Sequence, residues 1–244
     1  MNDPAHPLED EIAGIAALGF DFVDLTFEPP RAWPAEGAAV ARALAEHGLG
    51  IVAHTAPSLP IASPFPELRA QAHALLGRAF EEAAAAGASL VNVHPDALGP
   101  VFARADVRRR NGEAVAALAE AAAAVGLELM VENLWRFGTV EDMAAVFATA
   151  PAARFHLDVG HAHLAGALPE LATRFADRLV HVHVHDNDGT ADLHLPLGAG
   201  SVPWPDAVAA LRGVAYDGTV TIEVFGREEL ARSRDLWLEW WRAA

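Results

Sequence analysis

The chain has 244 residues, 52% of them hydrophobic, which is enough to bury a sizeable core, and its formal net charge is −16. It contains no cysteine, and all 17 of its basic residues are arginine. The missing cysteine excludes disulfides, thiolate metal ligands and cysteine nucleophiles, and the missing lysine excludes Schiff-base catalysis. The acidic charge disfavours duplex DNA, so we expect no nucleic-acid partner.

Export and membrane signals are missing from the sequence pattern. No apolar run reaches the roughly 18 residues of a membrane helix without a charge or a turn former. The opening stretch MNDPAHPLEDE has neither the basic nor the apolar region of a signal peptide. We therefore expect a cytoplasmic protein without membrane contact. The one basic cluster, Arg104 with Arg108, Arg109 and Arg110, is interpreted as a solvated helix face.

Strands and helices alternate along the chain. Helices are predicted over 8–19, 36–48, 66–87, 104–126, 139–150, 168–176, 203–213 and 227–242. Strands are predicted over 20–27, 49–55, 89–95, 127–133, 154–159, 178–186 and 218–225. Gly19 and Gly48 are expected to end the first two helices, and Thr139 with Asp142 has the spacing of a capping box.

This alternation is typical of parallel βαβ units. No glycine-rich phosphate loop follows the first strand, which argues against a doubly wound nucleotide-binding sheet. We therefore predict an α/β protein with a single (β/α)8 TIM barrel domain over 1–244. Its first strand is short or missing, because only MNDPAHP precedes the first helix. An incomplete first strand and the tryptophan-rich helix 227–242, a core or interface stripe, are compatible with a homodimer.

Six of the seven predicted strands carry metal-ligand residue types at or just after their carboxyl ends. These residues are His54, His94, Glu132, Asp158, His183 with His185, and Glu223. In a barrel, catalytic residues lie at the carboxyl ends of several strands at once. A lone strand histidine is more often a core residue, but six strands with this pattern predict a metal site. Imidazole with carboxylate suits Zn, Mn, Fe or Co.

Each candidate also has a structural interpretation. Glu132 and Glu223 could form buried salt bridges with arginine, and Asp158 could cap a helix that begins near Gly160. Histidines 54 and 94 could instead bind a substrate hydroxyl or phosphate, and the Asp192–His194 loop could be a simple turn. We interpret His181 as a core residue or a support for ligands. Five histidines are interpreted as structural: His6, His47, His73, His156 and His163. Trp135 and Trp204 are candidates for an apolar wall beside a sugar ring.

Seven motifs taken together resemble a known family. They are AHTAP, VNVHPD, VEN, LDVGH, HVHVHDN, DLHLPLGAG and TIEV, in that order. They resemble the xylose isomerase-like TIM barrels, also called AP endonuclease family 2, over nearly the whole chain. In the sugar isomerase and epimerase branch, one divalent metal is bound at positions matching Glu132, Asp158, His183 and Glu223. The resemblance implies that the two glutamates move the substrate proton, and that His161 binds substrate or a second metal.

The endonuclease IV branch of the same family has three zinc ions on nine ligands. All nine matching positions carry ligand-type residues here: His54, His94, Glu132, Asp158, His161, His183, Asp192, His194 and Glu223. Clustered metals of this kind stabilise the oxygens of phosphoester hydrolysis. The isomerase branch often has a lysine after the histidine of the HVHVHDN motif, where this chain has Val184 and His185.

The sequence therefore predicts a divalent-metal-dependent isomerase or epimerase of a small sugar or sugar phosphate. The reaction would pass through an enediolate, with Glu132 and Glu223 as catalytic proton shuttles and with His185 and Trp135 in contact with the substrate. The expected cofactor is Zn or Mn, as one to three ions. The alternative is a multinuclear zinc hydrolase of a small phosphoester.

Overall fold

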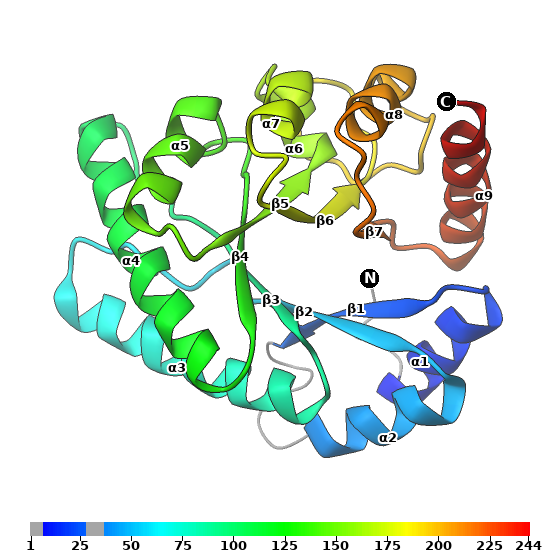
Figure 1. Ribbon diagram of the computed structural model, residues 1–244, viewed down its shortest axis with the longest axis horizontal. Helices are drawn as coiled ribbons and strands as arrows, with labels where there is room; N and C mark the ends of the chain where they lie inside the picture. Colours follow the sequence, from blue (N-terminus) through cyan, green and yellow to red (C-terminus); the bar gives the residue numbers. More distant parts are fainter. Residues whose placement is uncertain (1–6, 28–36) are drawn as a thin grey trace. The chain divides into compact units, whose positions relative to one another are not determined.

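The computed structural model describes residues 7–27 and 37–244, and the chain forms two compact units. The first unit comprises Met1–Val131 and Ala145–Ala153, and the second comprises Glu132–Ala144 and Arg154–Ala244. Figure 1 colours the chain from blue to red along the sequence. Each unit is built from parallel strands with helices between them, as the alternating pattern predicts.

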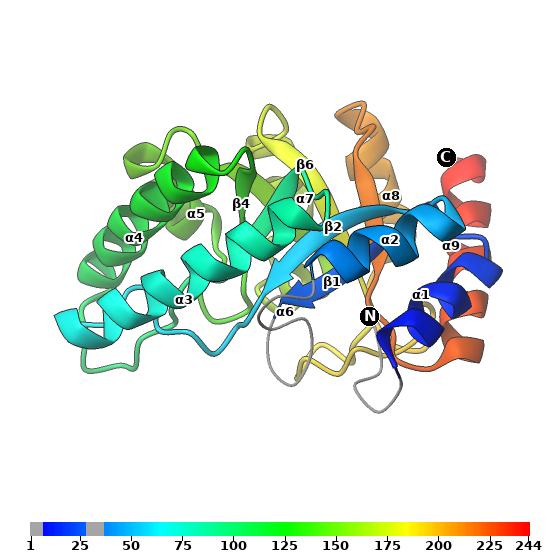
Figure 2. The same cartoon turned by 90° about the horizontal axis from the view of Figure 1, so that it is seen from below.

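The first unit contains four strands that pair in sequence order, all of them parallel. They are β1 (Phe22–Phe27), β2 (Gly50–Thr55), β3 (Leu90–Val93) and β4 (Glu128–Glu132), whose last residue belongs to the second unit. The helices are α1 (Leu8–Ala17), α2 (Gly37–His47), α3 (Pro66–Ala85) and α4 (Arg104–Ala124). Consecutive helices lie side by side in this unit (Figure 2). Helix α5 (Val140–Thr149) has its first turn in the second unit and the rest in the first.

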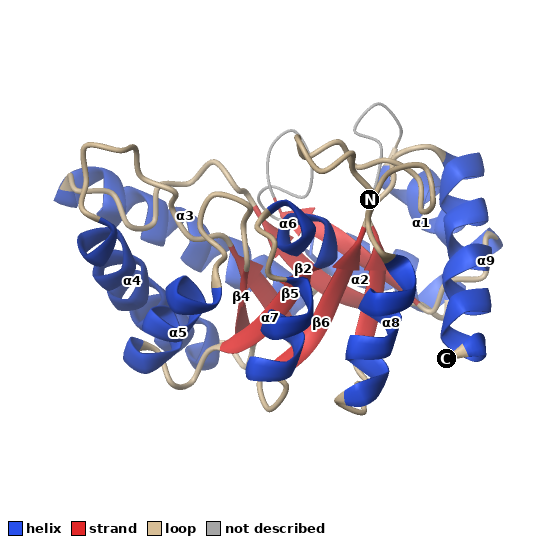
Figure 3. Ribbon diagram, turned by 90° about the horizontal axis from the view of Figure 1, so that it is seen from above, coloured by secondary structure: helices blue, strands red, loops and turns tan. Residues whose placement is uncertain are grey.

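The second unit contains three further parallel strands, again paired in sequence order. They are β5 (Arg154–Asp158), β6 (Leu179–Val184) and β7 (Thr219–Ile222). The helices are α6 (Val159–Leu164), α7 (Leu168–Arg174), α8 (Trp204–Gly213) and α9 (Arg227–Ala243). Figure 3 shows α6, α7 and α8 along the same side of these strands.

Strand burial follows from how the helices cover the sheet. In β1, alternate residues are buried, whereas β5 and β6 are buried on both faces over most of their length. Strands that are buried on both faces have apolar side chains in both directions, which matches the continuous apolar character of RFHLDV and LVHVHV. Polar residues in such strands are therefore placed in the interior.

The predicted elements agree closely with the observed ones. Every predicted strand and helix is present, with bounds that differ by a few residues. Gly19 and Gly48 adopt positive φ angles of 79° and 68° directly after the helices they were expected to end. The capping box is confirmed, because Thr139 N donates to Asp142 Oδ2 at 3.2 Å and Asp142 N donates to Thr139 Oγ1 at 3.3 Å.

Helix α6 was anticipated only as a helix that Asp158 could cap near Gly160, because its six residues are too few to show a helical period. The expected short or missing first strand falls on residues 1–6, which lie outside the described residues. The single-domain organisation over 1–244 stays a prediction. The stripe on the last helix is a core stripe in the second unit, where Trp237 is buried and Trp240 stacks on Trp204 at 5.5 Å between ring centroids.

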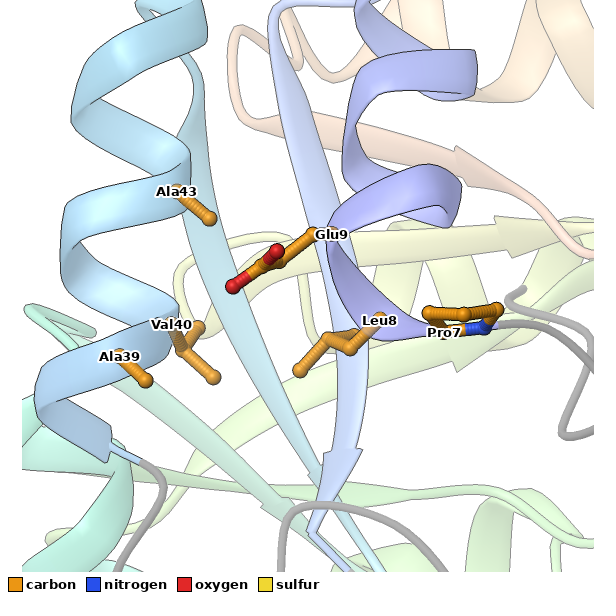
Figure 4. A pocket seen from close by; sticks show the side chains of 6 residues that line it. All are labelled: Pro7, Leu8, Glu9, Ala39, Val40 and Ala43. Carbon is orange, nitrogen blue, oxygen red and sulfur yellow. The ribbon is translucent and has the colours of Figure 1, made fainter.

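Among the described residues, none of the helices combines the length and the apolar character needed to cross a lipid bilayer. Helices α1 and α2 enclose a hollow of about 280 Å³ in the first unit (Figure 4). Its lining consists of Pro7, Leu8, Glu9, Ala39, Val40 and Ala43. Glu9 is the only lining side chain among these six that carries a charge, so the hollow offers few polar groups for a ligand.

Two helical glycines give a matched test of packing in the first unit. A Cβ on Gly112 of α4 would lie 2.8 Å from Thr149 Cβ of α5, whereas a Cβ on Gly77 of α3 would meet nothing within 4 Å. We expect Gly112→Ala to lower the free energy of unfolding by ~1–3 kcal/mol through overpacking. We expect Gly77→Ala to raise it by roughly 0.5–1 kcal/mol through helix propensity. Urea unfolding followed by circular dichroism measures both; equal effects would contradict close packing at Gly112.

Candidate metal centre

The predicted ligands of the second unit lie side by side at the carboxyl ends of its strands. A register shift between Phe155 and His156 aligns Asp158 of β5 with His183 of β6. His183 in turn pairs with Thr221 of β7, and Glu223 N donates to Val184 O at 3.0 Å just beyond that strand. Glu132 is the last residue of β4. The parallel register thus places side chains from four strand ends next to each other.

Four of the predicted ligands form one buried cluster. Carboxylate or imidazole atoms of Glu132, Asp158 and His183 all lie within 4.8 Å of one another. Glu223 Oε2 is 2.9 Å from His183 Nδ1, and all four residues are buried. Glu223 pairs with His183 and His194 and with no described arginine, so the salt-bridge alternative does not apply to it. Buried clusters of this composition suggest divalent metal binding.

Asp158 shows how helix capping and cation binding can be combined. Its Oδ1 accepts from His161 N at 2.6 Å, so the carboxylate does cap α6 as the structural interpretation proposed. Its Oδ2 is buried and has no hydrogen-bond partner among the described residues. A buried carboxylate oxygen without a partner is costly, and a cation would remove that cost. The donor set therefore fits a divalent metal, with Oδ2 as the free ligand atom.

A second group of predicted ligands lies beside the first. His161 Nε2 is 3.0 Å from Asp192 Oδ2, and His194 Nδ1 is 3.2 Å from Asp192 Oδ1. His194 Nε2 lies 3.4 Å from Glu223 Oε2, which joins the two groups. His185 stacks on His194 at 4.1 Å between ring centroids. Asp192 and His194 therefore face the cluster instead of forming a simple turn.

The tautomer of His161 follows from its backbone partner. His161 Nδ1 lies 3.1 Å from Asn133 O, and a carbonyl oxygen only accepts, so Nδ1 carries the hydrogen. This leaves Nε2 toward Asp192. A histidine whose second nitrogen donates to a backbone carbonyl is the usual arrangement of a metal-binding imidazole.

Four buried or half-buried carboxylates concentrate negative charge in the second unit, and positive charge has to balance it. Burial lowers the pKa of His161, but the charge of Asp158 and hydrogen bonds to Asp192 and Glu132 raise it well above its ordinary value. Burial is likewise outweighed at His185, where the charge of Asp158 raises the pKa to about 9. Burial raises the pKa of Glu223, yet His183 and His194 hold it well below its ordinary value. Protonated imidazoles or a divalent cation can supply the balancing charge.

Asn133 fixes the position of Asp158 and was missed by the sequence analysis. Its Nδ2 donates to Asp158 O, and its Oδ1 accepts from Asp158 N, both at 2.9 Å. The side-chain amide thus replaces a strand partner for the Asp158 backbone. Asparagine directly after Glu132 in the VEN motif was the available signal, because only an amide offers a donor and an acceptor together.

Asp186 is a second missed residue, and it organises the loop that carries Asp192 and His194. It is fully buried, and its Oδ1 accepts from Asn187 N and Val202 N at 2.9 and 3.0 Å. Its Oδ2 accepts from Gly198 N and Trp204 Nε1, both at 2.9 Å. Its backbone pairs with Leu195 as an antiparallel bridge. These contacts fold the loop back toward the cluster, so that the ring of His194 stacks on the ring of His185.

The packing of His185 explains why the LDVGH motif has a glycine at position 160. A Cβ at this position would collide with the ring of His185, so a glycine is needed for the imidazole to lie against α6. His194 has a φ of 48°, a left-handed conformation that is uncommon outside glycine and that clusters at functional sites.

Four other residues singled out in the sequence have the following surroundings. Trp204 is only 3% exposed and bonds Asp186, so its assignment to an apolar wall was wrong. Trp135 is 40% exposed, with the guanidinium carbon of Arg136 4.2 Å from a ring centroid, and its substrate contact stays a prediction. His156 was interpreted as structural, but its Nδ1 lies 3.4 Å from Glu132 Oε2. His181 bonds the hydroxyls of Thr219 and Thr221 as a support residue.

His54 and His94 belong to the first unit. Both are buried, and their ring centroids are 4.7 Å apart in an edge-to-face arrangement. The pairing of β2 and β3 brings these two strand ends together, as the sequence analysis expected. Their assignment as ligands stays a prediction.

Comparison with known proteins places the chain in a family. A family model described as "Xylose isomerase-like TIM barrel" matches residues 12–243. The chain belongs to this family. L-ribulose 3-epimerase of Methylomonas sp. (strain DH-1) is 28% identical over 249 aligned positions, which cover 94% of this chain and 84% of that protein.

Two other proteins are similar to this xylose isomerase-like chain. Uncharacterized protein MJ1311 of Methanocaldococcus jannaschii is 25% identical over 174 residues, which are 66% of this chain and 59% of that longer protein. The crystal structure of a D-tagatose 3-epimerase-like protein has a TM-score of 0.89 at 23% identity, covering 98% of this chain and 94% of that one. The predicted α/β TIM barrel fold class is therefore confirmed.

The support given by Asp186 in this xylose isomerase-like chain can be tested with a matched pair of substitutions. In Asp186→Asn, an NH2 group replaces an oxygen that accepts two buried donors, and each donor left unpaired costs ~1–3 kcal/mol. We expect the free energy of unfolding to fall by at least about 2 kcal/mol, with weaker metal binding. Asp188→Asn is the control, because Asp188 is exposed and an amide oxygen can still accept from Thr190 N. A similar loss in both variants, measured by denaturant unfolding, would refute the anchoring role.

Proposed function

We propose that the chain is a divalent-metal-dependent sugar isomerase or epimerase that acts on a ketose, with inversion at carbon 3 as the first reaction to test. The observation that carries the proposal is the buried cluster of Glu132, Asp158, His183 and Glu223. This set combines a metal-binding arrangement with two glutamates next to it. The Methylomonas relative, an L-ribulose 3-epimerase, supports the choice of reaction.

Glu132, Asp158, His183 and Glu223 would hold the metal, with Asp158 Oδ2 as a ligand atom that no other described group uses. When bound, a divalent cation supplies electrostatic stabilisation of negative charge on neighbouring substrate oxygens. Zn or Mn suits this mixture of imidazole and carboxylate. The fixed backbone of Asp158 keeps the ligand atoms in place through its bonds to Asn133.

The two glutamates would carry the proton chemistry. One carboxylate removes the proton from the carbon beside the substrate carbonyl, and the bonding pair of that C–H moves into the enediolate. The other glutamate, protonated, then gives a proton to the same carbon from the opposite face. One C–H bond breaks and one forms, so no oxidant or co-reactant is needed. His156, 3.4 Å from Glu132, and His183, 2.9 Å from Glu223, orient the two carboxylates.

Four further residues would contact the substrate or extend the metal centre. His161 presents Nε2 toward Asp192, and His185 lies 3.2 Å from Asp158 Oδ1. Trp135 and Phe225 are exposed aromatic side chains, and Phe225 lies 5.4 Å from His194 between ring centroids. Aromatic faces of this kind pack against the apolar face of a sugar ring.

A multinuclear zinc phosphoester hydrolase is the second candidate. The observation that favours it is the contact of Asp192 with both His161 and His194, because an enzyme with one metal does not require this second group. The substrate would be a small phosphoester, and clustered zinc ions would stabilise the attacking and leaving oxygens.

The epimerase proposal predicts proton exchange at a specific carbon. Incubation of L-ribulose, D-allulose and D-fructose with the Mn-loaded protein in D2O should yield the 3-epimer, with deuterium at carbon 3 by NMR. We expect Glu132→Gln and Glu223→Gln each to lower kcat by at least about 10²-fold, because the proton shuttle is lost. Asp188→Asn should keep full activity. Turnover without solvent deuterium would exclude the proton-shuttle mechanism.

Metal stoichiometry separates the two candidates. Elemental analysis of protein purified without chelator should give close to one exchangeable equivalent per chain for an epimerase. Under this proposal, His194→Ala should retain turnover with altered metal affinity. Two or three zinc equivalents, with hydrolysis of bis(p-nitrophenyl) phosphate that His194→Ala abolishes, would instead establish the hydrolase.

A further inference from the structure

A small cavity between α3 and α4 of the first unit combines two arginines with a histidine. It has a volume of about 140 Å³ and is lined by Arg69, His73, Arg110, Glu113, Ala114 and Ala117. The two helices lie side by side, which brings residues far apart in the sequence to one place (Figure 2). Against a chain charge of −16, a cavity with two arginines and a histidine is unusual.

Arg110 has the fewest hydrogen-bond partners of these side chains. It forms no hydrogen bond or ion pair with any described residue, and its Nε is buried without a partner. The sequence analysis placed it in a solvated arginine face, and this holds for its neighbour Arg109, which is exposed and paired with Glu113 and Asp106. Arg110 is half-buried and lines the cavity. Its guanidinium donors have no acceptor among the described residues, so an acceptor from outside the chain can complete them.

The other lining groups are held in place by backbone oxygens. Arg69 Nη1 donates to Ser63 O at 2.7 Å, and His73 Nε2 donates to Ile61 O at 3.0 Å. Each of these bonds uses one donor, and the remaining guanidinium donors of Arg69 are available. Because the carbonyl can only accept, His73 Nε2 carries a hydrogen, and Nδ1 stays available for another partner.

Glu113 is the only acid in the lining, and it is already neutralised. Both of its carboxylate oxygens accept from Arg109 Nη1, at 2.9 and 3.0 Å. Arg109 does not line the cavity, so its charge compensates Glu113 from outside. The cavity therefore keeps the positive charge of Arg69 and Arg110, while Ala114 and Ala117 leave space for a compact ligand.

We propose that this cavity is a binding site for a small oxyanion, namely inorganic phosphate or the phosphate group of a metabolite. Guanidinium groups bind phosphate through parallel N–H···O bonds, and the unpaired Arg110 offers such a pair. The volume of about 140 Å³ accommodates a phosphate group. The site belongs to the first unit and does not depend on the proposed epimerase activity.

An anion here would tie together two helices and one loop. Arg69 and His73 already hold the carbonyls of Ser63 and Ile61, and Ala62 N donates to Asp96 Oδ2 at 2.8 Å. Asn111, next to Arg110, bonds both Asp96 N and Asp96 O. Binding between Arg69 and Arg110 should therefore stabilise the folded first unit as a ligand that binds only the native state does.

The test is calorimetric titration and thermal unfolding of the full, metal-loaded chain with inorganic phosphate, against sodium chloride at equal ionic strength. We expect saturable binding and a rise in Tm that chloride does not produce. Arg110→Met should weaken binding at least tenfold, and Arg110→Lys should restore part of it, because charge returns without the planar fork. Arg42→Met is the control, because Arg42 is an exposed arginine on α2 of the same unit.

A parallel titration with glycerol 3-phosphate distinguishes the two sources of the anion. Binding of the ester that depends on Arg110 would assign the site to a phosphorylated metabolite, and binding of phosphate alone would assign it to the free ion. Phosphate binding that is unchanged in Arg110→Met would lie elsewhere, for example at the metal centre, and would overturn the proposal. Absence of any binding in the folded wild-type protein would overturn it as well.

Discussion

The burial of carboxylates at strand ends is the constraint on which the rest of the second unit depends. Glu132, Asp158 and Glu223 end strands that are surrounded by apolar side chains, where an unbalanced negative charge costs several kcal/mol. The chain supplies imidazoles in the same layer, and no described arginine pairs with Glu223. Histidine is suited to this place because it can accept a proton or bind a cation. If these strand-end positions had only a structural role, apolar residues would fill them at a lower free-energy cost of burial.

Support for these candidate ligands comes from residues outside the cluster. Asn133 replaces a strand partner for the Asp158 backbone, and Asp186 collects four donors from the loop that carries His194. Gly160 removes a Cβ so that His185 can lie against α6. Binding and catalysis require ligand atoms held within a narrow range of positions, and such hydrogen bonds restrict that range.

The two units use charge in opposite ways. The second unit gathers carboxylates around imidazoles, whereas the first places two arginines in a cavity whose single acid is neutralised from outside. In an acidic chain, a positive cavity attracts anions over a short distance only, because salt screens charges beyond about 10 Å. Cations and oxyanions would therefore bind at separate places on this protein, each where the local charge favours it.

The sequence by itself determined the elements and the residue types at the strand ends. Alternating strands and helices gave the fold class, because periods of 2 and 3.6 are local properties, and residues at strand ends such as Asp158 and His183 were visible because parallel strands end at one edge. Tertiary structure decided what depends on distant neighbours. No local pattern separates Arg110 from Arg109, shows that Trp204 is buried on Asp186, or reveals that Asn133 holds Asp158. These outcomes depend on which helix or strand end packs nearby, and contacts across 15 to 40 residues leave no periodic signal in the chain.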